Sequence, residues 1–166
     1  MVDTPFNDSY IETDAILAAM IGANPSASAV ALKALAAASQ AWYCQEATRH
    51  IDQLRLRGDK YDSTQDRAFP RVIDGIIVGD SDQNAVVPDD VLRACMEEAI
   101  ALYAEQSAGG TSRASLQEAG VASYQIPGII SETFRPGAGS ASQMGLKSSS
   151  SYRLLSKYIA RSVPIR

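Results

Sequence analysis

Apolar residues recur at steps of three and four along much of the chain, a pattern typical of helices with one buried face. The clearest stripe runs through Ala37, Ala41, Cys44, Ala47 and Ile51. The pattern predicts four helices. They lie at about residues 13–21, 28–54 with a candidate break near Ala38–Ser39, 88–106, and 150–160.

Two segments favour β structure instead. Residues 55–87 form a long connection rich in aspartate and glycine, and connections of this length in a compact domain are usually functional or disordered. Within it, residues 72–78 predict a short hairpin that turns at Asp74–Gly75. Residues 115–124 alternate weakly around Gly120, which favours a two-stranded ribbon.

These elements predict a mainly α fold: a small helical bundle with a minor β element and an extended C-terminal arm ending in a helix. Residues 1–134 are expected to form a helical body with the long loop 55–87. Residues 135–166 are expected to form a flexible linker, because their first half is rich in glycine and serine, followed by a docking helix.

Composition supports a globular chain: 46% of the residues are hydrophobic and 20% are charged. No apolar stretch is long enough to span a membrane, so no membrane partner is expected. The start of the chain, MVDTPFNDSY, is acidic and does not look like a secretory signal. Cys44 and Cys95 both fall inside predicted helices and suggest a reducing compartment.

Charge is distributed unevenly along the chain. Residues 1–132 hold all 19 acidic residues and nine basic ones, a net charge of −10. The remaining residues hold six basic side chains and no acid, a net charge of +6. A basic tail can bind nucleic acid or an acidic protein surface, including the acidic body of a second copy.

Few residues suggest catalysis. His50, the only histidine, has no visible nucleophile or orienting partner, so a structural role is favoured over a general base. The aspartates of residues 59–82 lack the spacing of a calcium loop, and residues 109–113 lack the lysine of a phosphate loop. Both cysteines are expected in the core. We therefore expect no enzyme activity, no metal site and no cofactor.

The last helix mixes apolar and cationic residues. Its docking candidates are Tyr152, Arg153, Leu155, Lys157, Tyr158, Ile159 and Arg161. Aromatic and cationic side chains together can bind single-stranded nucleic acid, but docking on a protein is the favoured interpretation. A helix this short needs a partner surface to be stable in water.

Several motifs occur in an order that resembles a known family. They are Tyr10 and Ala15-Ile16-Leu17 in the first helix, EATRHID at residues 46–52, RGDKYDSTQDRAFPR at residues 57–71, and VPDDVLRACMEEAIAL at residues 87–102. Over about residues 10–126 the chain is similar to the head–tail adaptor proteins of tailed phages, also called head completion or connector proteins. Some relatives carry a label of single-stranded-DNA-binding type.

The resemblance implies a structural virion protein at the head–tail junction, made in the host cytoplasm. Such adaptors form a homo-oligomeric ring, commonly a dodecamer, below the portal protein. The ring extends the DNA channel toward a downstream tail or stopper protein, and DNA passes through without specific binding. Alternative functions are a single-stranded-DNA-binding accessory protein, or another tail-junction protein such as a stopper or terminator.

The resemblance also suggests a role for QDRAFPRV at residues 65–72, which matches no catalytic motif. Pro70 fixes its own φ and favours an extended Phe69. Phe69 is expected to anchor the long loop in the helix pair, and Arg71 to reach an acidic neighbour. These three residues are the predicted loop anchor.

Overall fold

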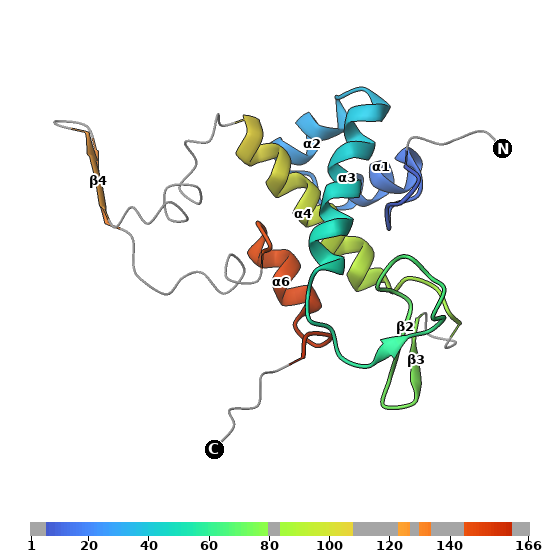
Figure 1. The fold of residues 1–166 in the computed structure, drawn as a ribbon. Helices are drawn as coiled ribbons and strands as arrows, with labels where there is room; N and C mark the ends of the chain where they lie inside the picture. Colours follow the sequence, from blue (N-terminus) through green and yellow to red (C-terminus); the bar gives the residue numbers. More distant parts are fainter. Residues whose placement is uncertain (1–5, 80–83, 108–122, 127–129, 134–144, 161–166) are drawn as a thin grey trace, which may run out of the picture.

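The computed structural model describes residues 6–79, 84–107, 123–126, 130–133 and 145–160. In this part of the chain the fold is mainly α-helical with small antiparallel β elements, which confirms the predicted fold class. Helices α3 (Ala37–Asp52) and α4 (Asp89–Ser107) pack together at the centre. Helices α1 (Asp14–Ala23) and α2 (Ala27–Lys33) lie at one end of this pair and a small sheet at the other (Figure 1).

Side-chain caps define where three of the helices begin. The hydroxyls of Thr13 and Ser26 accept hydrogen bonds from the third backbone N–H beyond them, at 3.2 and 3.1 Å, and so cap α1 and α2. Ser148 caps α6 (Ser149–Leu155) in the same way. Asp89 and Asp90 occupy the first turn of α4, where the helix dipole favours acids.

The long helix expected over residues 28–54 is two helices, and the break falls at residues 34–36 rather than at Ala38–Ser39. The buried Gln40 explains the position. Its side-chain amide donates hydrogen bonds to the carbonyls of Lys33 at 3.0 Å and Leu35 at 2.6 Å. A side chain of α3 thus binds carbonyls at the C-terminal end of α2.

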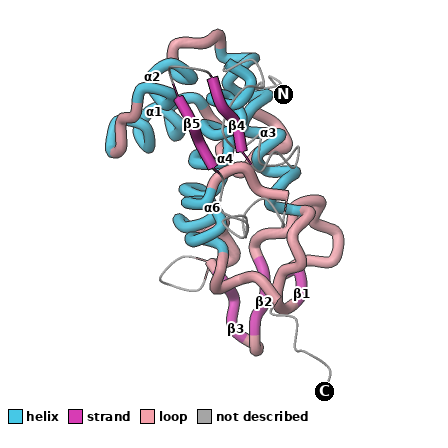
Figure 2. Tube along the Cα trace, turned by 90° about the vertical axis from the view of Figure 1, so that its left-hand side faces the viewer, coloured by secondary structure: helices cyan, strands magenta, loops and turns pink. Residues whose placement is uncertain are grey.

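The predicted hairpin is confirmed. Strands β2 (Arg71–Ile73) and β3 (Ile76–Val78) pair antiparallel, with Val72 opposite Ile77. Asp74 and Gly75 form the turn with φ of 53° and 80°, the left-handed values that a tight hairpin turn needs. Strand β1 (Asp59–Lys60) adds to the other edge of β2, giving the order β1-β2-β3 (Figure 2).

Gly58 allows β1 to approach β2 closely. It has a φ of 67°, and a Cβ there would lie 2.0 Å from the carbonyl oxygen of Val72. A side chain at this position would therefore clash with the backbone of β2.

A second, two-stranded ribbon is formed by β4 (Ser123–Ile126) and β5 (Ile130–Thr133), with Tyr124 opposite Glu132. The ribbon predicted at residues 115–124 overlaps it only at the end, and residues 115–122 lie outside the described part. The sequence between the two strands contains Pro127 and Gly128, which are turn-forming residues that the weak alternation did not reveal.

Helix α6 packs on α4 and belongs to the same hydrophobic core as the central pair. In the part of the chain that the structure describes, the buried apolar residues after α4 are Leu146, Leu155, Tyr158 and Ile159. The expected division at residue 134 therefore does not separate two cores in the described part of the chain. Most of the linker expected after residue 134 lies outside the described residues.

Candidate functional site

The predicted loop anchor lies in the core. Phe69 is 2% exposed, and its ring makes edge-to-face contacts with Tyr10 and Tyr158 at centroid distances of 6.2 and 5.2 Å. The Phe69–Pro70 peptide bond is cis. The loop is therefore held between the N-terminal segment and the segment that follows α6.

Tyr10 and Asp52 hold the backbone of the same loop. The phenol of Tyr10 donates a hydrogen bond to Oδ1 of Asp52 at the end of α3. The backbone N–H of Ala68 donates to the same carboxylate oxygen at 3.1 Å, and that of Phe69 donates to the phenol oxygen at 3.2 Å. Burial raises the pKa of Tyr10 and that of Asp52, and at Asp52 the hydrogen bonds from Tyr10 and Ala68 oppose the rise.

Arg71 does not reach the acidic neighbour expected from the sequence. Its guanidinium is buried and bonds to backbone carbonyls, not to an acidic neighbour. It donates hydrogen bonds to the carbonyls of Arg57 at 2.8 Å, of Ala68 at 3.2 Å and of Gly58. The five N–H donors of arginine suit this bridging role, which joins the connection after α3 to the start of β2.

His50 contacts a buried carboxylate. Its Nδ1 lies 2.8 Å from Oε1 of Glu98, which is 0% exposed. Because a carboxylate only accepts, Nδ1–H is the donor. Glu98 also accepts from the backbone N–H groups of Lys147 at 2.7 Å and Ser148 at 2.9 Å. The hydrogen bond to Glu98 raises the pKa of His50. This cluster fixes the start of α6 to α3 and α4, which is a structural role.

The apolar docking candidates of the last helix contact their own chain. Leu155, Tyr158 and Ile159 are buried against the body. The partner surface that this short helix requires is therefore supplied by α4 and the connection after α3, within the same chain. Tyr152 is half-buried and Arg153 is exposed, while Arg161 lies outside the described residues.

Backbone hydrogen bonds extend this contact. The N–H of Arg57 donates to the carbonyl of Tyr158, and that of Ala160 to the carbonyl of Arg55, both at 2.8 Å. Leu56 and Ile159 form an antiparallel bridge between them. Periodicity alone could not identify this pairing, because residues 55–57 and 158–160 are joined only by the fold.

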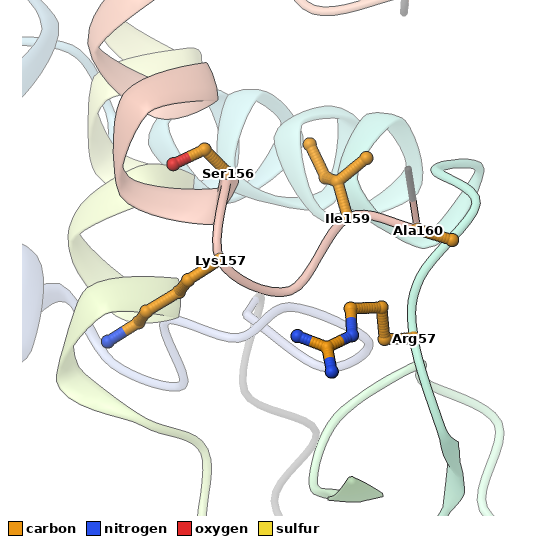
Figure 3. Close-up of a pocket in the computed structure, with 5 residues that line it drawn as sticks. All are labelled: Arg57, Ser156, Lys157, Ile159 and Ala160. Carbon is orange, nitrogen blue, oxygen red and sulfur yellow. The ribbon is translucent and has the colours of Figure 1, made fainter. Parts of the chain in front are cut away.

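An open cleft of about 520 Å³ lies beside this bridge, lined by Arg57, Ser156, Lys157, Ile159 and Ala160 (Figure 3). The two cations extend from opposing segments, Arg57 from the connection after α3 and Lys157 from the turn after α6. Each contacts a carboxylate: Arg57 lies 3.0 Å from Asp74, and Lys157 hydrogen-bonds to Asp90. The bond to Asp90 raises the pKa of Lys157. Two cations and a hydroxyl can bind an anion such as phosphate.

The cysteines are buried and unpaired. Burial raises the pKa of both thiols, that of Cys95 to about 11, which disfavours the reactive thiolate. Among the described residues, no group of three or more metal-ligating side chains could hold a metal ion. In the same part of the chain, no helix combines the length and the apolar character needed to cross a membrane.

Comparison with known proteins gives one family. A family model described as "Putative DnaT-like ssDNA binding protein" matches residues 4–164, nearly the whole chain. Neither a curated protein nor a solved structure matches.

Proposed function

The chain belongs to the DnaT-like family that this model describes, and from this premise we propose that it is an accessory protein that binds single-stranded DNA and catalyses no reaction. The observation that carries the proposal is the cleft between Arg57 and Lys157. Proteins that bind single strands without sequence preference track the phosphate backbone with a positively charged groove.

The acidic partners in the cleft do not prevent phosphate binding. The side chain of Asp74 is 80% exposed and that of Arg57 is 47% exposed. Exposed ion pairs of this kind contribute only about 0–1 kcal/mol, so a phosphate can replace the carboxylate at little cost. The same competition, together with the acidic body, predicts weak and salt-sensitive binding.

Further cations lie near the cleft in the sequence. Arg55 and Arg153 are exposed, and Arg161 and Arg166 follow the cleft residues along the chain. Contacts to phosphate carry no sequence information, so the protein is expected to bind single strands of any sequence.

Fluorescence anisotropy of a labelled oligothymidine, measured at low salt, tests the proposal. The intact protein should bind, and the double variant Arg57→Glu/Lys157→Glu should lose at least tenfold in affinity. Each lost phosphate contact should lower the slope of log affinity against log salt by about one.

The single variant Lys157→Glu should also lose affinity, and Lys33→Glu is its matched control, because both substitutions change the net charge equally. Lys33 also pairs with an exposed acid, Asp14, at the far end of the molecule. It should bind as the intact protein does. No binding at low salt, or equal affinities for the intact chain and the double variant, would exclude this cleft as the binding site.

A second candidate is the phage head–tail adaptor, which the sequence motifs favour. We propose this function because apolar side chains are exposed at both ends of the central helix pair. They are Ile16 and Val30 on α1 and α2 at one end, and Ile76 at the hairpin at the other. Apolar side chains exposed at opposite ends suit head-to-tail contacts between copies, which close a ring when the rotation permits.

In that function the protein would lie in the virion, bind the portal and a tail or stopper protein, and let DNA pass through a ring. The portal would contact Tyr152 and Arg153 on α6 and Lys157 in the turn after it. Electron microscopy of the purified protein, alone and mixed with a portal, separates the candidates. Rings with bound portal support the adaptor, and monomers that bind oligothymidine support the first proposal.

A further inference from the structure

Trp42 is the chain's one tryptophan, and 47% of it is exposed although it sits within α3. Tryptophan is usually largely buried, because its surface is costly to expose. Its exposure leaves a large aromatic side chain available to a ligand.

The ring is held in place by a chain of aromatic contacts. Trp42 makes an edge-to-face contact with Tyr43 at a centroid distance of 4.9 Å and an angle of 82°. Tyr43 contacts Tyr103 of α4 in the same way at 5.6 Å, and its phenol hydrogen-bonds to the side chain of Gln106. An aromatic ring positioned before binding loses little freedom when a ligand stacks on it.

One cation, Arg49, lies on the same face of α3 as Trp42. The two positions are seven residues apart, which brings their side chains to one side of the helix. Arg49 is exposed and pairs with Glu46 on the same side at 2.5 Å. From Trp42 the helix extends about 15 Å to its last residue, and the chain then continues through Arg55 to Arg57 in the cleft.

We propose that Trp42 is a base-stacking platform, at one end of a path for single-stranded DNA that follows this face of α3 to the cleft at Arg57 and Lys157. The inference rests on the proposed DNA-binding function. Arg49, Arg57 and Lys157 contact phosphates, and the indole stacks on a base. Every base has a π face, so the stacking adds affinity without sequence preference.

The single tryptophan allows a direct test, because indole emission reports this side chain alone. Oligothymidine is titrated into the intact protein while tryptophan emission and the anisotropy of a label on the oligonucleotide are both followed. Emission should fall over the same concentrations at which anisotropy rises. Trp42→Ala should lose about tenfold in affinity, and Trp42→Phe should retain most of it, because the smaller ring still stacks.

Tyr61→Ala is the control, since Tyr61 is equally exposed, at 49%, in the loop after β1. It should bind as the intact protein does, and circular dichroism should show every variant folded. A rise in anisotropy with unchanged tryptophan emission would overturn the stacking inference and leave the DNA-binding proposal standing. Equal losses from Tyr61→Ala and Trp42→Ala would also overturn it.

Two further outcomes have distinct meanings. No anisotropy change with any oligonucleotide would refute the proposed function itself, and with it the inference. The second outcome is tryptophan emission that, in the absence of DNA, changes with protein concentration while the mass of the particle rises. That result would assign Trp42 to a contact between copies and overturn the inference.

Discussion

The phenol of Tyr10 and the carboxylate of Asp52, 42 residues apart in the sequence, share a hydrogen bond that organises the loop at Phe69. The bond places an acceptor in front of each of two loop N–H groups, those of Ala68 and Phe69. The long connection after α3 is thus fixed at one point to both the N-terminal segment and the helix core.

Tyr10→Phe should destabilise the protein by about 1–3 kcal/mol, because it leaves the N–H of Phe69 without its acceptor and removes one of the two hydrogen bonds to the partly buried Asp52. Urea denaturation measures the loss. Tyr61→Phe, which removes a phenol from an exposed ring, should leave the midpoint unchanged. Equal midpoints for Tyr10→Phe and the intact protein would mean that water satisfies both groups.

Phe69→Ala should cost about 3 kcal/mol, because it removes a fully buried ring and leaves a cavity between Tyr10 and Tyr158. Ile76→Ala is the control, since Ile76 is exposed at the hairpin. Thermal melts followed by circular dichroism compare the two. An unchanged melting temperature for Phe69→Ala would place the loop's anchor elsewhere.

Stability should depend on pH through His50. The hydrogen bond to Glu98 raises the pKa of His50 above its ordinary value of 6.5. Burial and Lys147 oppose the shift, and the charge of Glu46 adds to it. The fold therefore holds the proton more tightly than the unfolded chain does. The resulting stabilisation is fully present below about pH 6.5 and is lost as pH rises through the raised pKa.

The measurement is the urea midpoint of the intact protein and of His50→Gln at about pH 6 and about pH 8.5. The intact protein should lose more stability across this interval than the variant, because glutamine can bond to Glu98 but does not titrate. Parallel losses in the two proteins would mean that other groups control the pH dependence.

Removal of residues 145–166 should disrupt the core. A chain ending at Met144 lacks Leu146, Leu155, Tyr158 and Ile159, and each large buried side chain contributes about 1.5–3 kcal/mol. That total is comparable to the whole stability of an ordinary domain. Thermal denaturation should show a broad transition or none.

A chain ending at Ala160 is the matched control, because it keeps every contact described for α6. It should melt as the intact protein does. A sharp transition at the intact protein's temperature for the chain ending at Met144 would show that the C-terminal helix is independent of the body, as the division at residue 134 predicts.

The sequence predicted well those elements whose ends are set by the conformational preferences of neighbouring residues. Asp74–Gly75 identified the hairpin turn, because few residues accept positive φ, and the helix predicted at residues 88–106 matches α4 to within one residue at each end. The position of the break between α2 and α3 was missed. It depends on Gln40, whose amide bonds to carbonyls beyond the break, a contact that periodicity does not contain.

The candidate site was less predictable, because its parts meet only through tertiary packing. The apolar stripe of the last helix was visible, but a stripe does not say whether its partner is the same chain or another. A charged side chain such as Arg71 suggests a carboxylate partner, yet burial gave it backbone carbonyls instead. Likewise, nothing in the sequence indicated that Trp42 faces solvent.

Residues 156–160 contribute both to the hydrophobic core and to the cleft beside it. Tyr158 and Ile159 lie in the core, while Ser156, Lys157 and Ala160 line the cleft beside it, with Ile159 touching both. Occupancy of the cleft and the folding free energy are therefore linked. An anion that bridges Arg57 and Lys157 joins the segment after α6 to the connection after α3, and it therefore stabilises the folded chain. Once the anion concentration exceeds the dissociation constant, the melting temperature should rise with the logarithm of that concentration. A thermal shift can thus serve as a binding assay for this protein before any natural ligand is known.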